Sequence, residues 1–284
     1  MKKSEIYIRD PFVLPYQGKY YMYGTRGPES WADKATGLDV YVSENLEDWT
    51  GPEEVFRRPD DFWATRDFWA PEVYEHNGAF YMFVSLKSDI ERRGTFILKA
   101  DAPDGSFKPH SERITPQEWE ALDGTLYVDK KGTPYMVFSH EWVQITDGQI
   151  CAVELAPDLS RAVGTPFTLI TASEAPWTVA DDGKTYVTDG PYLLSLSSGR
   201  LAMLWSSFGN KGYAVGVAYS LNGEIDGKWV HEKEPLFETD GGHAMVFNTF
   251  DGKKLMALHY PNETTKERPY FYELVENKEI LKRI

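Results

Sequence analysis

The chain is poor in cysteine, in positive charge and in long apolar runs, and each shortage excludes something. Cys151 is the one cysteine among 284 residues, so the sequence offers no pair for an intrachain disulfide and no cluster of thiolate metal ligands. The formal net charge of -14 argues against nucleic acids and anionic membranes as partners, because phosphate binding needs clustered Lys and Arg. No apolar run reaches the roughly 18 residues of a membrane-spanning helix.

The N-terminal segment also lacks the apolar stretch of a secretory signal. MKKSEIYIRD carries charged residues but no hydrophobic core. The chain as given therefore predicts a cytoplasmic location, and a secreted or periplasmic one if a signal has been removed from it.

What the chain does have is aromatic residues, strand patterns and a fivefold repeat. In each repeat a short polar signal precedes an apolar strand, a Gly turn and an aromatic-rich strand. The repeats start at Asp10 (RDPFV), Trp69 (WAPEVY), Asp123 (DGTLYV), Asp189 (DGPYLL) and His243 (HAMVF). A spacing of roughly 55–65 residues with several strands per unit is typical of propeller blades rather than of helical solenoids.

Each repeat continues through further strand patterns. Second strands are predicted at 18–26, 78–88, 132–142, 199–208 and 252–262, and third strands at 38–43, 95–100, 150–155, 213–220 and 270–274. Trp49, Phe107 and Trp229 mark outer segments, and a single helical turn is predicted at 115–122. Four strands per unit predict an all-β, five-bladed β-propeller formed as one domain by residues 1–284.

Residues from different blades should meet at one end of such a propeller. The first strand of each blade lines the central channel, and the antiparallel second strand returns to the same rim. The five repeat starts should therefore share one face with the ends of the second strands. That face would gather carboxylates, His and aromatic side chains, which is the functional signal in this sequence.

At these residues the sequence resembles glycoside hydrolase family 43, whose members are five-bladed propeller enzymes such as arabinofuranosidases, xylosidases and arabinanases. RDPFV resembles the first-blade motif, which implies that Asp10 is the general base. Asp123 matches the residue that orients the acid and raises its pKa. His243 in GGHAMVF matches a channel histidine that often ligates a structural cation, here calcium or sodium. No catalytic cofactor is implied.

One position departs from the family pattern. The fourth-blade motif usually reads Glu-Gly-Pro with the glutamate as general acid, whereas this chain has Asp189 in TDGPYLL. An aspartate sets its carboxyl back by about an ångström, which can cost on the order of 100-fold in rate. Asp189 and Glu141 in SHEW are nearly equal candidates for the acid, with Glu174 in SEAPW behind them. A propeller that has lost its acid is the remaining possibility.

Ordinary structural roles compete with these assignments. Asp-Pro and Asp-Gly are common turn pairs, and Glu141 could form a salt bridge with His140 instead of acting in catalysis. Most aromatic side chains must pack between blades, so only rim-facing ones can stack on a sugar. The predicted substrate-binding residues are Arg26, Phe68, Trp69, His140, Trp142, Trp205, Phe208 and His259.

The sequence thus predicts a glycoside hydrolase that cleaves plant-type polysaccharide or oligosaccharide side chains with inversion. Exo-α-L-arabinofuranosidase activity is the leading expectation. A β-xylosidase, a galactosidase-type relative and a carbohydrate-binding propeller with impaired catalysis are the alternatives. A carbohydrate is the expected partner, and the loops at 27–36 and 60–68 should shape the pocket.

Overall fold

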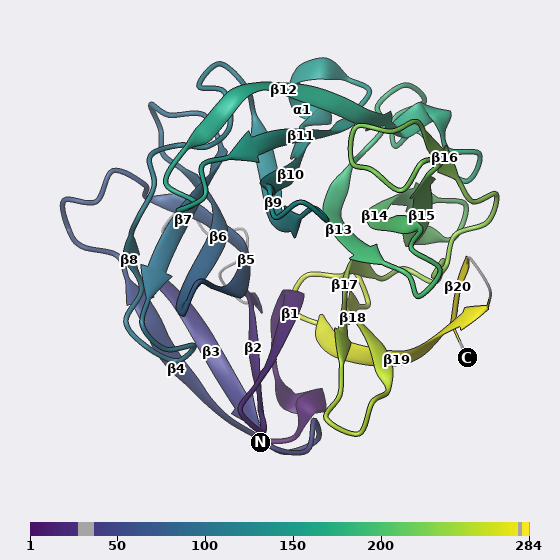
Figure 1. The fold of residues 1–284 in the computed structure, drawn as a ribbon. Coiled ribbons are helices and arrows are strands. Elements are labelled where there is room, and N and C mark those ends of the chain that lie inside the picture. The colour runs from purple at the N-terminus through teal and green to yellow at the C-terminus, as the bar shows by residue number, and fades with distance from the viewer. Residues whose placement is uncertain (28–36, 278–279, 284) are drawn as a thin grey trace.

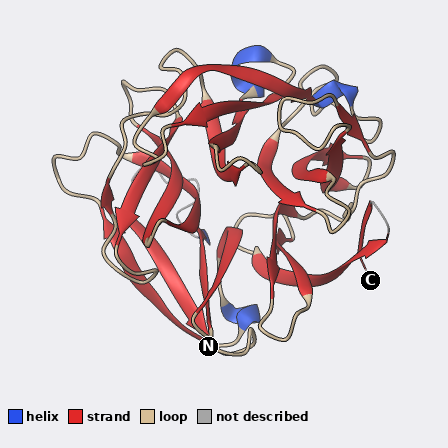
Figure 2. Ribbon diagram, viewed as in Figure 1, coloured by secondary structure: helices blue, strands red, loops and turns tan. Residues whose placement is uncertain are grey.

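The computed structural model describes residues 1–27, 37–277 and 280–283, so most of the loop at 27–36 lies outside the described residues. Five four-stranded sheets surround a central axis (Figure 1). The regular secondary structure is almost entirely strand, joined by many loops, with short helical turns at the periphery (Figure 2). The predicted five-bladed β-propeller is confirmed. None of the described helices is long and apolar enough to cross a membrane.

Each sheet consists of four strands that follow one another in the chain. Blade 1 contains β1 (Ile8–Tyr16), β2 (Lys19–Arg26), β3 (Gly37–Ser43) and β4 (Trp49–Arg57). Blade 2 contains β5 (Arg66–His76), β6 (Ala79–Lys87), β7 (Gly94–Ala100) and β8 (Lys108–Pro109). Blade 3 contains β9 (Ala121–Val128), β10 (Pro134–His140), β11 (Gln149–Leu155) and β12 (Ala162–Thr171).

The last two blades follow the same order. Blade 4 contains β13 (Asp189–Ser195), β14 (Leu201–Gly209), β15 (Gly212–Ser220) and β16 (Trp229–His231). Blade 5 contains β17 (Gly242–Asn248), β18 (Lys254–Tyr260), β19 (Arg268–Asn277) and β20 (Ile280–Arg283). Three short helical segments complete the described elements: η1 (Lys3–Glu5), α1 (Trp142–Ile145) and η3 (Ala172–Glu174).

Several predicted strand ends differ from the observed ones by a few residues, and two local predictions differ in the type of structure. The second strand of blade 3 ends at His140, because its partner β9 begins at Ala121, directly opposite. Glu141 then precedes the four-residue helix α1. The helical turn predicted at 115–122 is an irregular turn. The Arg113 guanidinium donates a hydrogen bond to the Trp119 carbonyl oxygen at 2.6 Å there.

Blade 1 packs against blade 5 to close the ring without sharing a strand. Phe12 and Tyr20 belong to the same apolar cluster as Met245 and Phe247. The Phe250 N–H donates to the Tyr20 hydroxyl at 3.0 Å. Ring closure therefore depends on side-chain packing and on hydrogen bonds between the first and last blades.

Each innermost strand carries a bulge near its start. The register shifts there, and one residue adopts a left-handed backbone. These residues are Asp10 (φ 54), Ala70 (φ 45), Asp123 (φ 58), Gly190 (φ 47) and His243 (φ 53). Because non-glycine residues rarely adopt this conformation, a repeated occurrence at equivalent positions indicates a feature that the surrounding structure enforces.

Candidate active site

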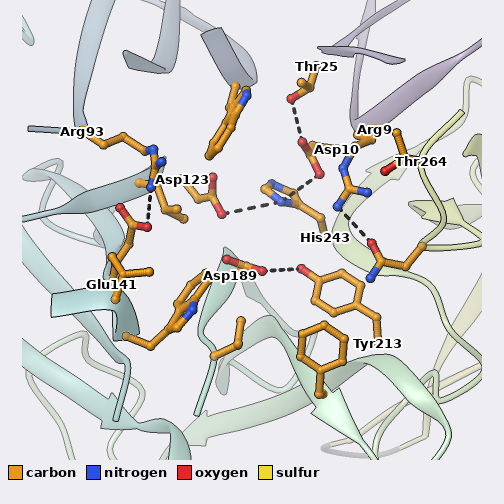
Figure 3. A pocket seen from close by; sticks show the side chains of 17 residues that line it. Arg9, Asp10, Thr25, Arg93, Asp123, Glu141, Asp189, Tyr213, His243 and Thr264 are labelled. Carbon is orange, nitrogen blue, oxygen red and sulfur yellow. Dashed lines mark hydrogen bonds and ion pairs between the residues drawn. The ribbon is translucent and has the colours of Figure 1, made fainter. Parts of the chain in front are cut away.

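A cavity of about 380 Å³ lies where the five innermost strands begin. Its wall includes all five repeat starts, namely Asp10, Trp69, Asp123, Asp189 and His243. Figure 3 shows how carboxyl groups from blades 1, 3 and 4 approach it from different sides, with His243 between Asp10 and Asp123. The bulges turn these side chains toward the axis, so the repeat delivers chemistry from different blades to one place.

Hydrogen bonds between blades fix four of the five bulges. The backbone N–H of the left-handed residue donates to a side chain from the second strand of the preceding blade. These pairs are Ala70 to Thr25 (2.8 Å), Asp123 to Ser85 (2.9 Å), His243 to Ser206 (2.8 Å) and Asp10 to His259 (3.2 Å). Such bonds offset part of the cost of the strained backbone.

The fourth blade breaks this rule. The equivalent side chain, Ser139, donates instead to the carbonyl of Thr188 at 2.6 Å. The Gly190 N–H donates to Asp123 Oδ2 at 3.0 Å. Asp189 precedes the bulge residue, as Trp69 does in blade 2, so it is not equivalent to Asp10 and Asp123 in the repeat.

Asp10 is held by three neighbours that favour its ionised form. The Thr25 hydroxyl donates to its Oδ2 at 2.6 Å, and His243 Nδ1 lies 3.3 Å from its Oδ1. Because Thr25 Oγ1 already accepts the Ala70 N–H, its own hydrogen is free to point at Asp10. Burial opposes ionisation, but the charges of His243 and Arg9 lower the pKa of Asp10 below its ordinary value.

His259 is a neutral support for Asp10. Its Nδ1 accepts the Asp10 backbone N–H. Its Nε2 lies 3.3 Å from the side-chain Oδ1 of Asn262, to which it can only donate. The side chain is 0% exposed, and burial lowers its pKa. Arg9 donates to Asn262 Oδ1 at 3.0 Å and to Glu267 at 2.8 Å, so an ordered network stands behind the Asp10 carboxylate.

The pKa values of Asp123 and Asp189 are raised, whereas that of Asp10 is lowered. Burial and the charge of Asp10 raise the pKa of Asp123 well above its ordinary value. Burial and the charge of Asp123 raise the pKa of Asp189 to about 8. The Tyr213 hydroxyl donates to Asp189 Oδ2 at 2.9 Å. The cavity therefore combines a carboxylate that stays ionised with a carboxyl group that stays protonated near neutral pH.

Glu141 lies on the cavity wall but turns its charge toward Arg93. One carboxyl oxygen pairs with the Arg93 guanidinium, and the other is buried without a partner among the described residues. Arg93 also donates to Asp67 at 2.9 Å and lies 4.3 Å over the Trp69 ring. Burial raises the pKa of Glu141 against the opposing effect of Arg93. With 1% of its surface exposed, Glu141 does not present an oxygen to a ligand in this conformation.

Glu174 is an exposed residue in η3 and is not among the residues that line the cavity. Burial lowers the pKa of His231, and the charge of Glu174 opposes this shift in part. Glu174 lies in the segment that leads into blade 4, but it does not reach the cavity.

The predicted substrate-binding residues divide into two groups. Trp69, Trp142 and Phe208 line the cavity. The other predicted residues, which are Arg26, Phe68, His140, Trp205 and His259, do not.

Each of these five has a different environment. Arg26 pairs with Asp39 at 2.6 Å, and Phe68 and Trp205 are buried in the interblade core. His140 stacks on Trp119 with ring centroids 3.9 Å apart, and the predicted His140–Glu141 salt bridge is replaced by the Arg93 pair. His259 supports Asp10 from behind the wall.

Several cavity residues were not named as catalytic or substrate-binding residues, although Thr25 and Asn262 lie in second-strand ends that were predicted at the rim. Arg9, Thr25, Arg93, Tyr213 and Asn262 all line the cavity. Arg93 lies in the connection between β6 and β7, and Tyr213 lies at the start of β15, directly after the turn from β14; these connections lie at the same rim as the second-strand ends. Including these connections in the predicted rim would have identified Arg93 and Tyr213.

The residues around His243 do not form a side-chain cage for calcium or sodium. The described residues contain no group of three or more His, Cys, Asp or Glu side chains that could hold a metal ion. His243 Nδ1 faces Asp10 and Asp123 at 3.3 and 3.6 Å and is used in those contacts. The predicted structural cation stays a prediction, and no chemical step here depends on it.

Comparison with known proteins assigns the family. The model described as "Glycosyl hydrolases family 43" matches residues 5–277. The chain belongs to glycosyl hydrolases family 43. The crystal structure of an endo-arabinase from Bacteroides thetaiotaomicron VPI-5482 is similar at a TM-score of 0.90 and 40% identity, covering 98% of each chain.

Curated relatives match over shorter stretches. Xylosidase/arabinosidase 43A of Humicola insolens is 26% identical over 49% of this chain and 45% of that protein. Extracellular endo-alpha-(1->5)-L-arabinanase 1 of Bacillus subtilis is 24% identical over 48% of this chain and 44% of that protein. The chain therefore matches less than half the length of these two relatives.

Proposed function

We propose that this protein is an inverting glycoside hydrolase that cleaves α-L-arabinofuranosyl linkages. The observation that carries the proposal is that one cavity is lined by two carboxyl groups in opposite protonation states. Asp10 is kept ionised by His243 and Arg9, whereas the pKa of Asp189 is raised to about 8 by burial and by Asp123. Inversion needs one carboxylate to activate water and one carboxylic acid to protonate the leaving oxygen.

Asp10 is the proposed general base. Its carboxylate is oriented by the Thr25 hydroxyl at 2.6 Å and by His243 Nδ1 at 3.3 Å. A water molecule beside it would lose a proton to Asp10 as its oxygen bonds to the anomeric carbon. The low pKa of Asp10 makes it a weak base but keeps it available at every ordinary pH.

Asp189 is the proposed general acid in preference to Glu141. Asp189 lines the cavity with its carboxyl held by Tyr213, and its raised pKa keeps it protonated at neutral pH. Glu141 is 1% exposed and is paired with Arg93, so it would have to break that pair and move to reach a substrate. Its proposed role is to hold Arg93 in the cavity wall.

Asp123 is the proposed modulator of the acid. It accepts the N–H of Gly190, the residue that follows Asp189, at 3.0 Å. It therefore fixes the backbone beside the acid, and repulsion between the two carboxylates disfavours the state in which both are ionised, which keeps a proton on the pair near neutral pH.

The relatives support the proposed sugar and mode of action. Relatives named as arabinanases, arabinofuranosidases and xylosidase/arabinosidases support arabinan or xylan side chains as substrates. Exo-action on arabinofuranosyl ends is the first expectation. Endo-action on arabinan is the second, and it is favoured by the 40% identity to an endo-arabinase.

The test compares wild type with Asp10→Asn, Asp189→Asn and Glu141→Gln. Substrates are nitrophenyl pentosides and linear arabino-oligosaccharides, and the first-formed anomer is followed by NMR. We expect inversion, loss of activity in Asp10→Asn, and a loss in Asp189→Asn that is much larger for oligosaccharides than for the activated leaving group. Glu141→Gln should keep most activity.

Other outcomes would change the assignment. Loss in Glu141→Gln with a surviving Asp189→Asn would move the acid to Glu141. Sugar binding without hydrolysis of any substrate would identify a carbohydrate-binding propeller. Product lengths from arabinan would separate exo-action from endo-action, and xylose release would favour a β-xylosidase.

The cellular location is also a proposal. Two relatives are named as extracellular arabinan enzymes, which supports export of this protein in place of the expected cytoplasmic location. Fractionation of cells that make the protein from its native gene would decide between the two.

A further inference from the structure

Tyr213 approaches the cavity from the hairpin between β14 and β15 and contacts the Asp189 carboxyl group (Figure 3). Its hydroxyl donates to Asp189 Oδ2 at 2.9 Å. The side chain is 2% exposed and lines the cavity. Burial and the nearby Asp189 charge raise the pKa of Tyr213 well above its ordinary value, so the phenol stays a hydrogen-bond donor.

The tyrosine ring is held on several sides. Its face stacks on His259 with centroids 5.7 Å apart and an interplanar angle of 16°. Phe208 packs beside it at 5.4 Å, and the Tyr213 backbone N–H donates to Asp240 at 3.3 Å. A side chain at Gly242 would collide with the ring. The hydroxyl therefore occupies one position and cannot follow a moving carboxyl group.

This geometry has a consequence for the two oxygens of Asp189. A carboxylic acid has one protonated oxygen, and its unprotonated carbonyl oxygen is the stronger hydrogen-bond acceptor, so the Tyr213 hydrogen bond favours the unprotonated state of Oδ2. The proton then belongs on Oδ1. After proton transfer the Tyr213 hydrogen bond is made to a carboxylate, and bonds to charged acceptors are roughly twice as strong as neutral ones.

We propose that Tyr213 is a positioning residue that fixes the proton of Asp189 on Oδ1 and stabilises the carboxylate formed when that proton leaves. This rests on the proposed function. In the step, the Asp189 Oδ1–H bond breaks and its proton passes to the glycosidic oxygen. The bond from that oxygen to the anomeric carbon breaks, and its electron pair stays on the leaving oxygen. Water supplies the new bond and gives its proton to Asp10, while Tyr213 keeps its own proton throughout.

The pH dependence follows from the groups that face Asp189. These are Asp123 from β9, His243 from β17, Tyr213 from β15 and Asp10 from β1. Among them His243 favours the ionised form by its charge and Tyr213 favours it by hydrogen bonding, whereas Asp123 and Asp10 disfavour it. Removing the hydroxyl should raise the pKa of Asp189 further, so the alkaline limb of kcat/KM should move upward from about pH 8.

The test compares Tyr213→Phe with wild type on an arabino-oligosaccharide and on an arabinoside with an activated leaving group. We expect kcat on the oligosaccharide to fall roughly 10- to 100-fold, the magnitude of a hydrogen bond to a developing charge. KM should change little, the activated substrate should lose much less, and the alkaline limb should move to higher pH.

Tyr192→Phe is the matched control. Tyr192 is also a buried tyrosine with a hydroxyl hydrogen bond, but it donates to the Val246 carbonyl at 2.8 Å and does not contact Asp189. It should keep the wild-type pH profile and the wild-type ratio of the two substrates.

A structural effect of Tyr213→Phe would give a different result. Water entering the site would lower the pKa of Asp189 and move the alkaline limb downward. That movement, an unmoved limb, or equal losses on both substrates would overturn the role of Tyr213. Asp189→Asn measured in parallel separates the two levels: if it keeps wild-type activity on the oligosaccharide, the acid assignment itself fails.

Discussion

Replacing Asp189 by Asn should stabilise the fold while it abolishes proton donation. Asp189 is buried beside Asp123, and its pKa is raised from 3.8 to about 8. The folded protein must therefore keep a proton there that the unfolded chain gives up at neutral pH. An asparagine still accepts the Tyr213 hydroxyl but carries no charge to desolvate.

The sign and the size come from proton linkage. A group whose pKa is raised on folding favours the folded state below its unfolded pKa, and that contribution is lost as the pH rises toward the folded value. Each pH unit in this window is worth about 1.4 kcal/mol. From the ordinary aspartate pKa to pH 7 the cost reaches at most about 4 kcal/mol. Asp189→Asn should remove this cost.

The assay is urea unfolding of wild type and Asp189→Asn at intervals from pH 4 to pH 9. The unfolding free energies should be nearly equal near pH 4. The variant's advantage should then grow by up to about 1.4 kcal/mol per pH unit and level off above about pH 8. Activity on oligosaccharides, measured on the same samples, should be lost throughout.

Two results would refute this reasoning. A stability difference that does not change with pH would mean that Asp189 is not protonated in the folded protein. A variant less stable than wild type at pH 7 would mean that the ionised carboxylate is stabilised by its neighbours, and Asp189 could not then serve as a general acid at neutral pH.

Two further substitutions test other parts of the site. Asp10→Asn should lower the free energy of unfolding at neutral pH. The depressed pKa of Asp10 stabilises the fold above the ordinary aspartate pKa, and this stabilisation is lost as the pH falls toward the pKa of Asp10 in the folded protein. Urea unfolding at pH 7 and pH 3 should therefore show a stability deficit that is smaller at pH 3. Gly190→Ala should cost about 2–4 kcal/mol in unfolding free energy and much of the activity, because its backbone is left-handed and the new Cβ would lie 2.8 Å from the His243 ring. Ala70→Gly, at the equivalent bulge, should change stability by less than about 1 kcal/mol, and a similar small effect of Gly190→Ala would contradict the proposed collision.

The fold was predictable because each blade is local in the sequence. Every strand pairs with its sequence neighbour, so a repeated strand pattern corresponds directly to a repeated sheet. Ends of elements depend on pairing with distant residues and were less predictable. β10 ends at His140 because β9 begins at Ala121, and no local signal in SHEW states this.

The site was predictable only in part, because side chains of the same type have opposite fates. Trp142 and Trp205 both fall near the ends of second strands, yet Trp142 lines the cavity and Trp205 is fully buried against Trp177. The burial of Trp205 follows from the alternation of side chains along β14. Ser206 faces blade 5, where it accepts the His243 N–H, so the adjacent Trp205 points to the opposite face of the sheet. Arg93 as the partner of Glu141 depends on a long-range contact that the sequence does not reveal.

The one departure from the repeat accounts for the relation between Asp123 and Asp189. Four bulge N–H groups bind a side chain of the preceding blade's second strand, but Ser139 is diverted to Thr188, and the Gly190 N–H is left for Asp123. The backbone beside Asp189 is therefore tied directly to the Asp123 carboxyl group. An aspartate has fewer side-chain torsions than a glutamate, so this tie leaves its carboxyl little freedom relative to Asp123. For the acid role proposed for Asp189, this means that the backbone largely sets the position of the carboxyl group.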